Sequence, residues 1–215
     1  MPRAKTSRAR DVIELVLGYA LIVGIIWSPD RLQRILSPVA LVLTLLAVLA
    51  RKKSRDELGV GTRGLRKSLW ILPAAIALCA VSIFVAAKVD TLHPLYKGDL
   101  KHIVGYVLWT IYQQFLLQDF FMDRLLRMMP SAAAVTLAGI LFATAHLPNL
   151  VLTAACVVWG IVSCVLFRRY GNLWMLGLAQ GMLGLCFAIC VPDSLHHHLR
   201  VGLGYLRYHS AQPVP

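Results

Sequence analysis

The sequence predicts an all-α protein, a polytopic bundle of about seven transmembrane helices. Hydrophobic residues make up 58% of its 215 positions and charged residues only 15%, and the mean hydropathy is +0.68. Soluble domains are closer to half apolar, with about 25% charged residues. The apolar residues also form long runs, and a membrane-spanning helix needs about 20 mostly apolar residues. We therefore expect a multi-pass integral membrane protein.

Seven apolar runs are separated by polar or basic segments, and we predict one helix in each run. The expected helices are 12–27, 35–50, 69–87, 103–122, 132–147, 150–167 and 173–191. Pro148 and Asn149 predict a tight turn between the fifth and sixth helices, because proline cannot continue the helical hydrogen bonds. The first two runs are short, so the hairpin they form either spans the bilayer or enters only one leaflet.

The distribution of Lys and Arg predicts the orientation of these helices. Basic residues collect in the N-terminal arm and after the second, fourth and sixth runs. In a protein of seven spans these segments all lie on one side, and basic loops face the cytoplasm. The formal net charge of +12 therefore reflects topology, and no soluble basic face predicts binding of nucleic acid. We expect a bacterial cytoplasmic membrane, with the N-terminus in the cytoplasm and the lipid bilayer around the helices.

The chain divides into five parts, without an internal repeat. These are a basic cytoplasmic arm (1–10), an N-terminal transmembrane hairpin (11–50), a basic cytoplasmic loop (51–68), a core of five transmembrane helices (69–191) and a polar C-terminal tail (192–215). The tail contains three adjacent histidines, but no other ligands stand at the spacing of a zinc site. We therefore predict neither a metal ion nor a cofactor.

Polar side chains within the predicted spans are the candidates for a functional site, because a polar group in hydrocarbon needs a partner. Gln113, Gln114 and Gln118 lie on the fourth helix, and the last two share a face because they are four residues apart. His146 lies close to the end of the fifth helix, and Gln180 lies between glycines on the seventh. Alternatively, these side chains form structural hydrogen bonds that only hold the helices together.

The order and spacing of these residues resemble the CPBP family of CAAX prenyl proteases and bacteriocin-processing proteins, also called ABI-type intramembrane glutamic proteases. That family has the motifs E-E-x-x-x-R, F-x-x-x-H and H-x-x-x-N on successive core helices. The segment from Phe142 to His146 matches the second motif in full, and Tyr170–Trp174 with Ala179-Gln180 matches the approach to the third. The similarity covers about residues 58–184, so the core at 69–191 is CPBP-like.

The chain departs from the family at most motif positions. Gln113 and Gln114 stand where the family has its glutamate pair, and Gln118 stands at the motif arginine. Gln180 and Gly184 replace the third-motif histidine and asparagine. In the family, a glutamate and the second-motif histidine are thought to activate a water molecule. An amide can orient that water but cannot take its proton.

The resemblance therefore implies an intramembrane endopeptidase, a hydrolase that cleaves membrane-anchored peptides or proteins, with a degraded or altered active site. His146 would be its only obvious base, and Gln180 could donate a hydrogen bond to an oxyanion. The alternative is a catalytically inactive pseudoprotease that binds a membrane peptide or a lipidated partner. A transporter fits less well, because transporter spans usually repeat.

Overall fold

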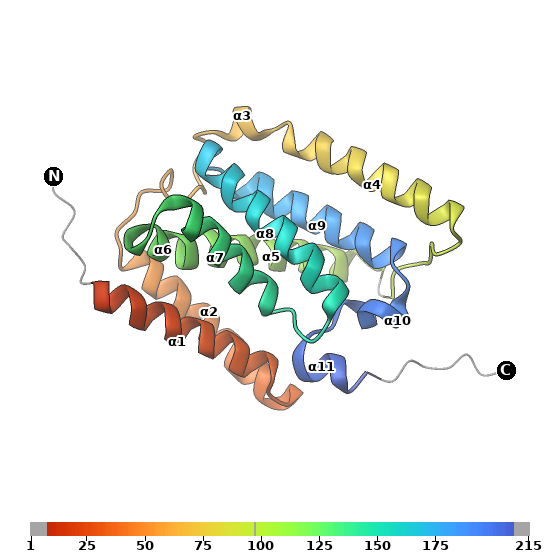
Figure 1. Ribbon diagram of the computed structural model, residues 1–215, viewed down its shortest axis with the longest axis horizontal. Helices are drawn as coiled ribbons and strands as arrows, with labels where there is room; N and C mark the ends of the chain where they lie inside the picture. The colour runs from red at the N-terminus through yellow and green to blue at the C-terminus, as the bar shows by residue number, and fades with distance from the viewer. Residues whose placement is uncertain (1–7, 97, 209–215) are drawn as a thin grey trace.

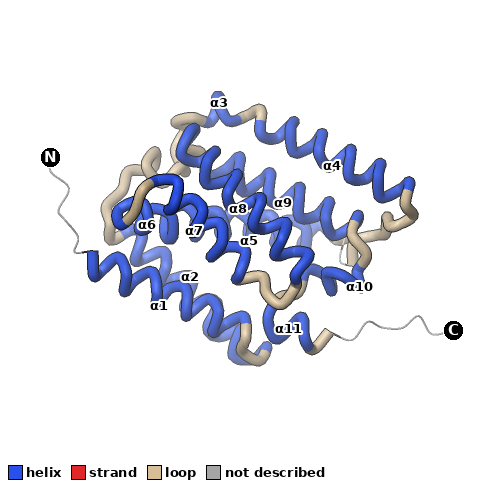
Figure 2. The backbone as a smooth tube through the Cα atoms, in the orientation of Figure 1, coloured by secondary structure: helices blue, strands red, loops and turns tan. Residues whose placement is uncertain are grey.

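The computed structural model describes residues 8–96 and 98–208, and all regular structure within them is helical (Figures 1 and 2). The longer helices are α1 (Arg8–Ile26), α2 (Asp30–Leu49), α4 (Ile71–Lys88), α5 (Leu100–Phe115), α7 (Ser131–Thr144), α8 (Leu150–Tyr170) and α9 (Leu173–Cys190). The shorter ones are α3 (Leu65–Ser68), η1 (Leu116–Met122), α6 (Asp123–Met128), α10 (Asp193–His196), η2 (His197–Leu199) and α11 (Gly202–Leu206). The predicted all-α helix bundle is confirmed. Most of the predicted basic arm (1–10) lies outside the described residues.

Within residues 8–96 and 98–208, four helical segments are long and apolar enough to cross a membrane, in keeping with a multi-pass integral membrane protein. They are α2, the segment Leu65–Lys88 that contains α4, α8 and α9. The other three predicted spans correspond to α1, α5 with η1, and α7. Their length or composition indicates a membrane span less clearly, because α1 carries charges in its first turns and α7 has only 14 residues.

Helices α5, α7, α8 and α9 form the centre of the bundle (Figure 1). Helix α4 packs on α9 along one edge, and the α1–α2 hairpin lies along the opposite edge. Glycines permit the closest approaches between the central helices. A Cβ atom on Gly177 of α9 would lie 2.8 Å from Ile111 Cα of α5, and one on Gly160 of α8 would lie 3.0 Å from Gly139 Cα of α7.

Several expected helix boundaries differ in the structure, and two of them lie near the predicted site. The fourth predicted helix, 103–122, is an α-helix only as far as Phe115 and continues as the π-helix η1. A π-helix bonds residue i to i+5, and such segments are frequent at functional sites. The fifth predicted helix, 132–147, ends at Thr144, because the turn before Pro148 begins earlier than the apolar run indicates.

A buried ion network fixes the α1–α2 hairpin to η1 and α6. Glu14 of α1 lies 2.6 Å from a guanidinium nitrogen of Arg51 and 2.7 Å from one of Arg124. The Arg124 side chain is fully buried, lies over the Phe120 ring at 3.9 Å and donates to the Phe120 carbonyl at 2.8 Å. Lys53 pairs in turn with the buried Asp119 at 3.3 Å. The hairpin is therefore joined to the same helical segment that carries Gln118.

Candidate functional site

Four glutamines at the motif positions form one hydrogen-bond network between α5, η1 and α9. Gln114 Nε2 donates to Gln180 Oε1 at 2.6 Å, and Gln180 Nε2 donates to Gln113 Oε1, also at 2.6 Å. Gln118 Nε2 donates to Gln114 Oε1 at 3.0 Å, as the spacing of four residues predicts. The structure therefore brings together Gln113, Gln114, Gln118 and Gln180, although α9 is far from α5 and η1 in the sequence.

Helix α8 adds two polar partners that the sequence did not single out. The Trp159 indole N–H donates to Gln180 Oε1 at 3.1 Å. Ser163, one helical turn further on, lies 3.5 Å from Gln118 Nε2 through its hydroxyl oxygen and donates to the Gly160 carbonyl. A tryptophan and a serine in an apolar run give no sequence signal of this kind, because both also occur as ordinary packing residues in membrane helices.

The network is buried at one end and accessible at the other. Gln114 and Gln118 are 0% and 1% exposed, whereas Gln113 and Gln180 are half-buried. Gln118 Oε1 is buried and accepts no hydrogen bond from the described residues. A buried acceptor without a donor is costly, and in native structures it is commonly satisfied by a water molecule or a ligand.

His146 has no hydrogen bond to the glutamines within the described part of the chain. Its Nδ1 lies 2.8 Å from the Phe142 carbonyl, and the ring packs edge-on against the Phe142 ring. Because a carbonyl can only accept, Nδ1 must carry the proton, which leaves the Nε2 lone pair available in the neutral ring. His146 follows the end of α7 at Thr144 and lies seven residues beyond Gly139, the point where α7 crosses α8.

The C-terminal segment 192–208 folds over the turn that contains His146, and we call it the C-terminal cap. Asn149 is fully buried and donates to the carbonyls of His196 at 2.8 Å and Arg200 at 3.1 Å. The Gly202 N–H donates to the Leu147 carbonyl at 2.8 Å. Figure 1 shows the cap, with α10 and α11, at the end of the bundle where α7 and α8 meet.

Charged and aromatic side chains hold the cap in shape. The Tyr208 hydroxyl donates to Asp193, and His198 Nδ1 lies 2.5 Å from the same carboxylate. Burial alone would raise the pKa of Asp193, but these hydrogen bonds hold it below its ordinary value. Burial and the bond to Asp193 raise the pKa of Tyr208 to about 12. Burial also lowers the pKa of His196, against the opposing charge of Asp193.

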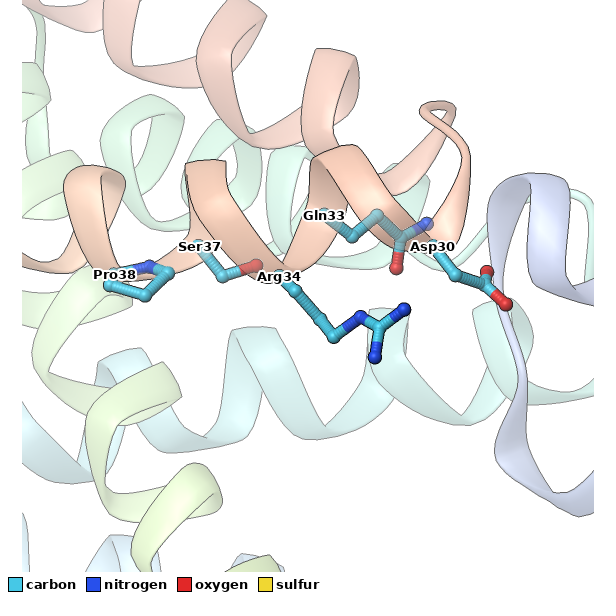
Figure 3. A pocket seen from close by; sticks show the side chains of 5 residues that line it. All are labelled: Asp30, Gln33, Arg34, Ser37 and Pro38. Atoms are coloured by element: carbon cyan, nitrogen blue, oxygen red, sulfur yellow. The ribbon is translucent and has the colours of Figure 1, made fainter.

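A cavity of about 660 Å³ opens beside α2, away from the predicted site. Its lining consists of Asp30, Gln33, Arg34, Ser37 and Pro38, all on one side of the helix (Figure 3). None of the predicted site residues lines it. Among residues 8–96 and 98–208, no group of three or more His, Cys, Asp or Glu side chains is placed to hold a metal ion.

Fold and site together define a multi-pass helical membrane protein with an amide-rich centre built from three helices. Residues 99–186 match the family model described as type II CAAX prenyl endopeptidase Rce1-like. This match confirms the resemblance to the CPBP family, and its range includes all five predicted site residues. No curated protein matches the chain, and no solved structure does.

Proposed function

We propose that the protein is a CAAX-protease-like intramembrane endopeptidase with an altered active site, acting on membrane-anchored peptides or proteins. One observation carries the proposal: the glutamines at the motif positions of the matched segment form a single hydrogen-bond network. Random loss of an active site would not be expected to preserve mutually bonded amides at these positions. In this proposal the glutamines hold the backbone of the bound peptide, and His146 accepts a proton from the attacking water through Nε2.

His146 forms no hydrogen bond with the glutamines among the described residues, so in this proposal the two groups act at different points along the bound peptide. An extended peptide advances about 3.3–3.6 Å per residue, so three residues cover about 10 Å. A substrate that runs from the glutamines toward the end of α7 would then expose a peptide bond beside His146. The glutamine network would fix the register of the chain, and the base would act a few residues away.

Hydrolysis of a farnesylated peptide that ends in a CAAX sequence, by the purified protein in detergent, tests this function. His146→Ala should lower the rate by about 100-fold or more, the usual loss when a general base is removed. His102→Ala is the matched control, because His102 is exposed at the start of α5 and pairs only with Asp99 among its described contacts. Equal rates for the wild type and His146→Ala would refute the role of His146.

A second candidate function is a pseudoprotease that binds the same class of peptide without cutting it. It is favoured by one observation, namely that no carboxylate is hydrogen-bonded to the glutamine network in the described part of the chain. Saturable binding of the farnesylated peptide, with no hydrolysis by the wild type, would support this function and exclude the first.

We also propose that the protein resides in a bacterial cytoplasmic membrane with its N-terminus in the cytoplasm, and that residues 11–50 form a separate hairpin beside a core at 69–191. The basic residues of the predicted cytoplasmic segments support the orientation. The ion network of Glu14, Arg51 and Arg124 supports the hairpin as a unit docked on the core. Reporter fusions to either end of the chain test the orientation, and an extracytoplasmic N-terminus would contradict it.

A further inference from the structure

In a network of amide side chains, a neighbouring group must fix which end of each amide donates and which accepts. A glutamine side chain can turn over, exchanging its donor NH₂ and its acceptor oxygen with little change of shape. Gln113 and Gln114 bond only to other glutamines of the network among the described residues. Gln118 also bonds to Ser163, whose hydroxyl group can donate or accept. Gln180 is different, because its Oε1 also faces the Trp159 indole N–H at 3.1 Å. An indole N–H can only donate, so the oxygen of Gln180 must point toward α8.

The orientation of the Gln180 amide also fixes the orientations of Gln113 and Gln114. Gln180 Oε1 accepts from Gln114 Nε2 at 2.6 Å, so Gln114 must present its donor there. Gln180 Nε2 donates to Gln113 Oε1 at 2.6 Å, so Gln113 must present its acceptor. The two neighbouring glutamines therefore have opposite hydrogen-bonding roles toward the same partner.

We propose that Trp159 is a positioning residue that decides at which of the two motif positions the site can hold a negative charge. An ionised carboxylate at position 113 would still accept the hydrogen bond from Gln180 Nε2, because the Gln113 oxygen that it replaces is also an acceptor. At position 114 it would bring a carboxylate oxygen against Gln180 Oε1, which lies 2.6 Å from the present donor. Two acceptors at that distance repel, and the cost is high in a buried site.

Replacing Trp159 by phenylalanine removes the donor while keeping an aromatic ring. The Gln180 amide can then turn over and offer Nε2 to position 114. Gln113 can follow by turning its own NH₂ toward the Gln180 oxygen, since its side chain forms no other hydrogen bond with the described residues. The difference between the two positions should therefore depend on Trp159.

Thermal unfolding in detergent near neutral pH tests this dependence with two matched substitutions, Gln113→Glu and Gln114→Glu. In the wild-type background, Gln114→Glu should lower the melting temperature by at least about 3 °C more than Gln113→Glu, as expected for one unsatisfied buried group. In the Trp159→Phe background this gap should shrink by at least half. Trp70→Phe is the control, because Trp70 lies outside the network against Tyr170 and should leave the gap unchanged. Absence of the gap in the wild type, or an equal gap in both backgrounds, would overturn the inference.

If Gln114→Glu yields no folded protein, hydrogen exchange at the Trp159 indole N–H gives a second measurement. Gln180→Leu should raise the exchange rate about tenfold, the equivalent of one lost hydrogen bond. Gln118→Leu should not raise it, because Gln118 does not contact the indole through a hydrogen bond. An exchange rate unchanged in Gln180→Leu would overturn the role of Trp159.

The effect of Trp159 on catalysis rests on the proposed function. Hydrolysis assays distinguish a failure of the proposed function from a failure of the role of Trp159. If the protein is a peptidase, Gln113→Glu should raise the rate on the farnesylated peptide, and Gln114→Glu should do so only together with Trp159→Phe. If no variant hydrolyses the peptide while the melting temperatures follow the expected pattern, the proposed function fails and the role of Trp159 stands.

Discussion

Glu14→Gln removes a carboxylate of α1 that pairs with both Arg51 and Arg124. Its oxygens lie 2.6 Å and 2.7 Å from nitrogens of these two guanidinium groups. The Arg124 side chain is fully buried and that of Arg51 is only 6% exposed, so neither can regain hydration without local unfolding. The substitution keeps the shape of the side chain, removes its charge and replaces one acceptor oxygen by a donor NH₂ group.

The expected loss of stability follows from these contacts. Removing one partner of a buried ion pair typically costs about 3–5 kcal/mol. We expect the lower end, about 3 kcal/mol, because Arg51 also pairs with Asp11 at 2.7 Å and Glu14 is partly exposed. For a chain of this size that corresponds to a fall in melting temperature of about 6–12 °C.

Thermal unfolding in detergent, followed by the fraction of protein that stays monodisperse after heating, measures this loss. Asp99→Asn is the matched control, because Asp99 forms an exposed pair with His102 at the other end of the bundle. Exposed pairs contribute little, so its melting temperature should stay close to that of the wild type. A melting temperature for Glu14→Gln no lower than that of Asp99→Asn would refute the view that this network holds the hairpin on the core.

Three further predictions concern packing and the C-terminal cap. Gly177→Ala should destabilise the protein by about 1–3 kcal/mol, since its Cβ would lie 2.8 Å from a backbone atom of α5. Gly105→Ala is the control in the same melting assay, and it should be neutral or stabilising because no atom lies within 4 Å of its added Cβ. Asn149→Ala removes the donor to the His196 and Arg200 carbonyls of the cap, and hydrogen–deuterium exchange should rise at 196–202 but not in α9. The pKa of His196 is lowered from 6.5, so the unfolded cap takes up the proton first and the stabilisation is lost as the pH falls below about 6.5. After correction for the pH dependence of intrinsic exchange, the protection of cap amides should therefore fall from about pH 7 to about pH 5, and less so in His196→Asn.

The helices were predictable because hydrophobic runs of span length have few alternatives in a chain of this composition. The residues at which the helices begin and end were less predictable. The π-helix η1 lies inside the fourth apolar run, and its change of hydrogen-bond register leaves no mark on composition. The three successive residues with positive φ at His197, His198 and Leu199 were equally invisible, since their conformation depends on contacts with Asp193 and Tyr208.

The candidate site was accessible to sequence reasoning only in part. Spacing placed Gln114 and Gln118 on one face, and the motif order indicated that Gln180 belonged with them; the hydrogen bonds between these residues agree with both expectations. Trp159 could not be found in this way, because one tryptophan in an apolar helix does not reveal where its N–H points. The pairing of Glu14 with Arg124, 110 positions apart, likewise depends on tertiary structure.

Binding of a farnesylated CAAX peptide to the wild type and to Gln180→Leu, measured in detergent at equal protein concentration, tests the account most directly. Gln180 contacts Gln113, Gln114 and Trp159, so its loss disconnects the network while leaving His146 in place. We predict that the dissociation constant rises at least about tenfold, the equivalent of one hydrogen bond to the peptide. Unchanged affinity in a folded Gln180→Leu protein would show that the glutamines only hold helices together.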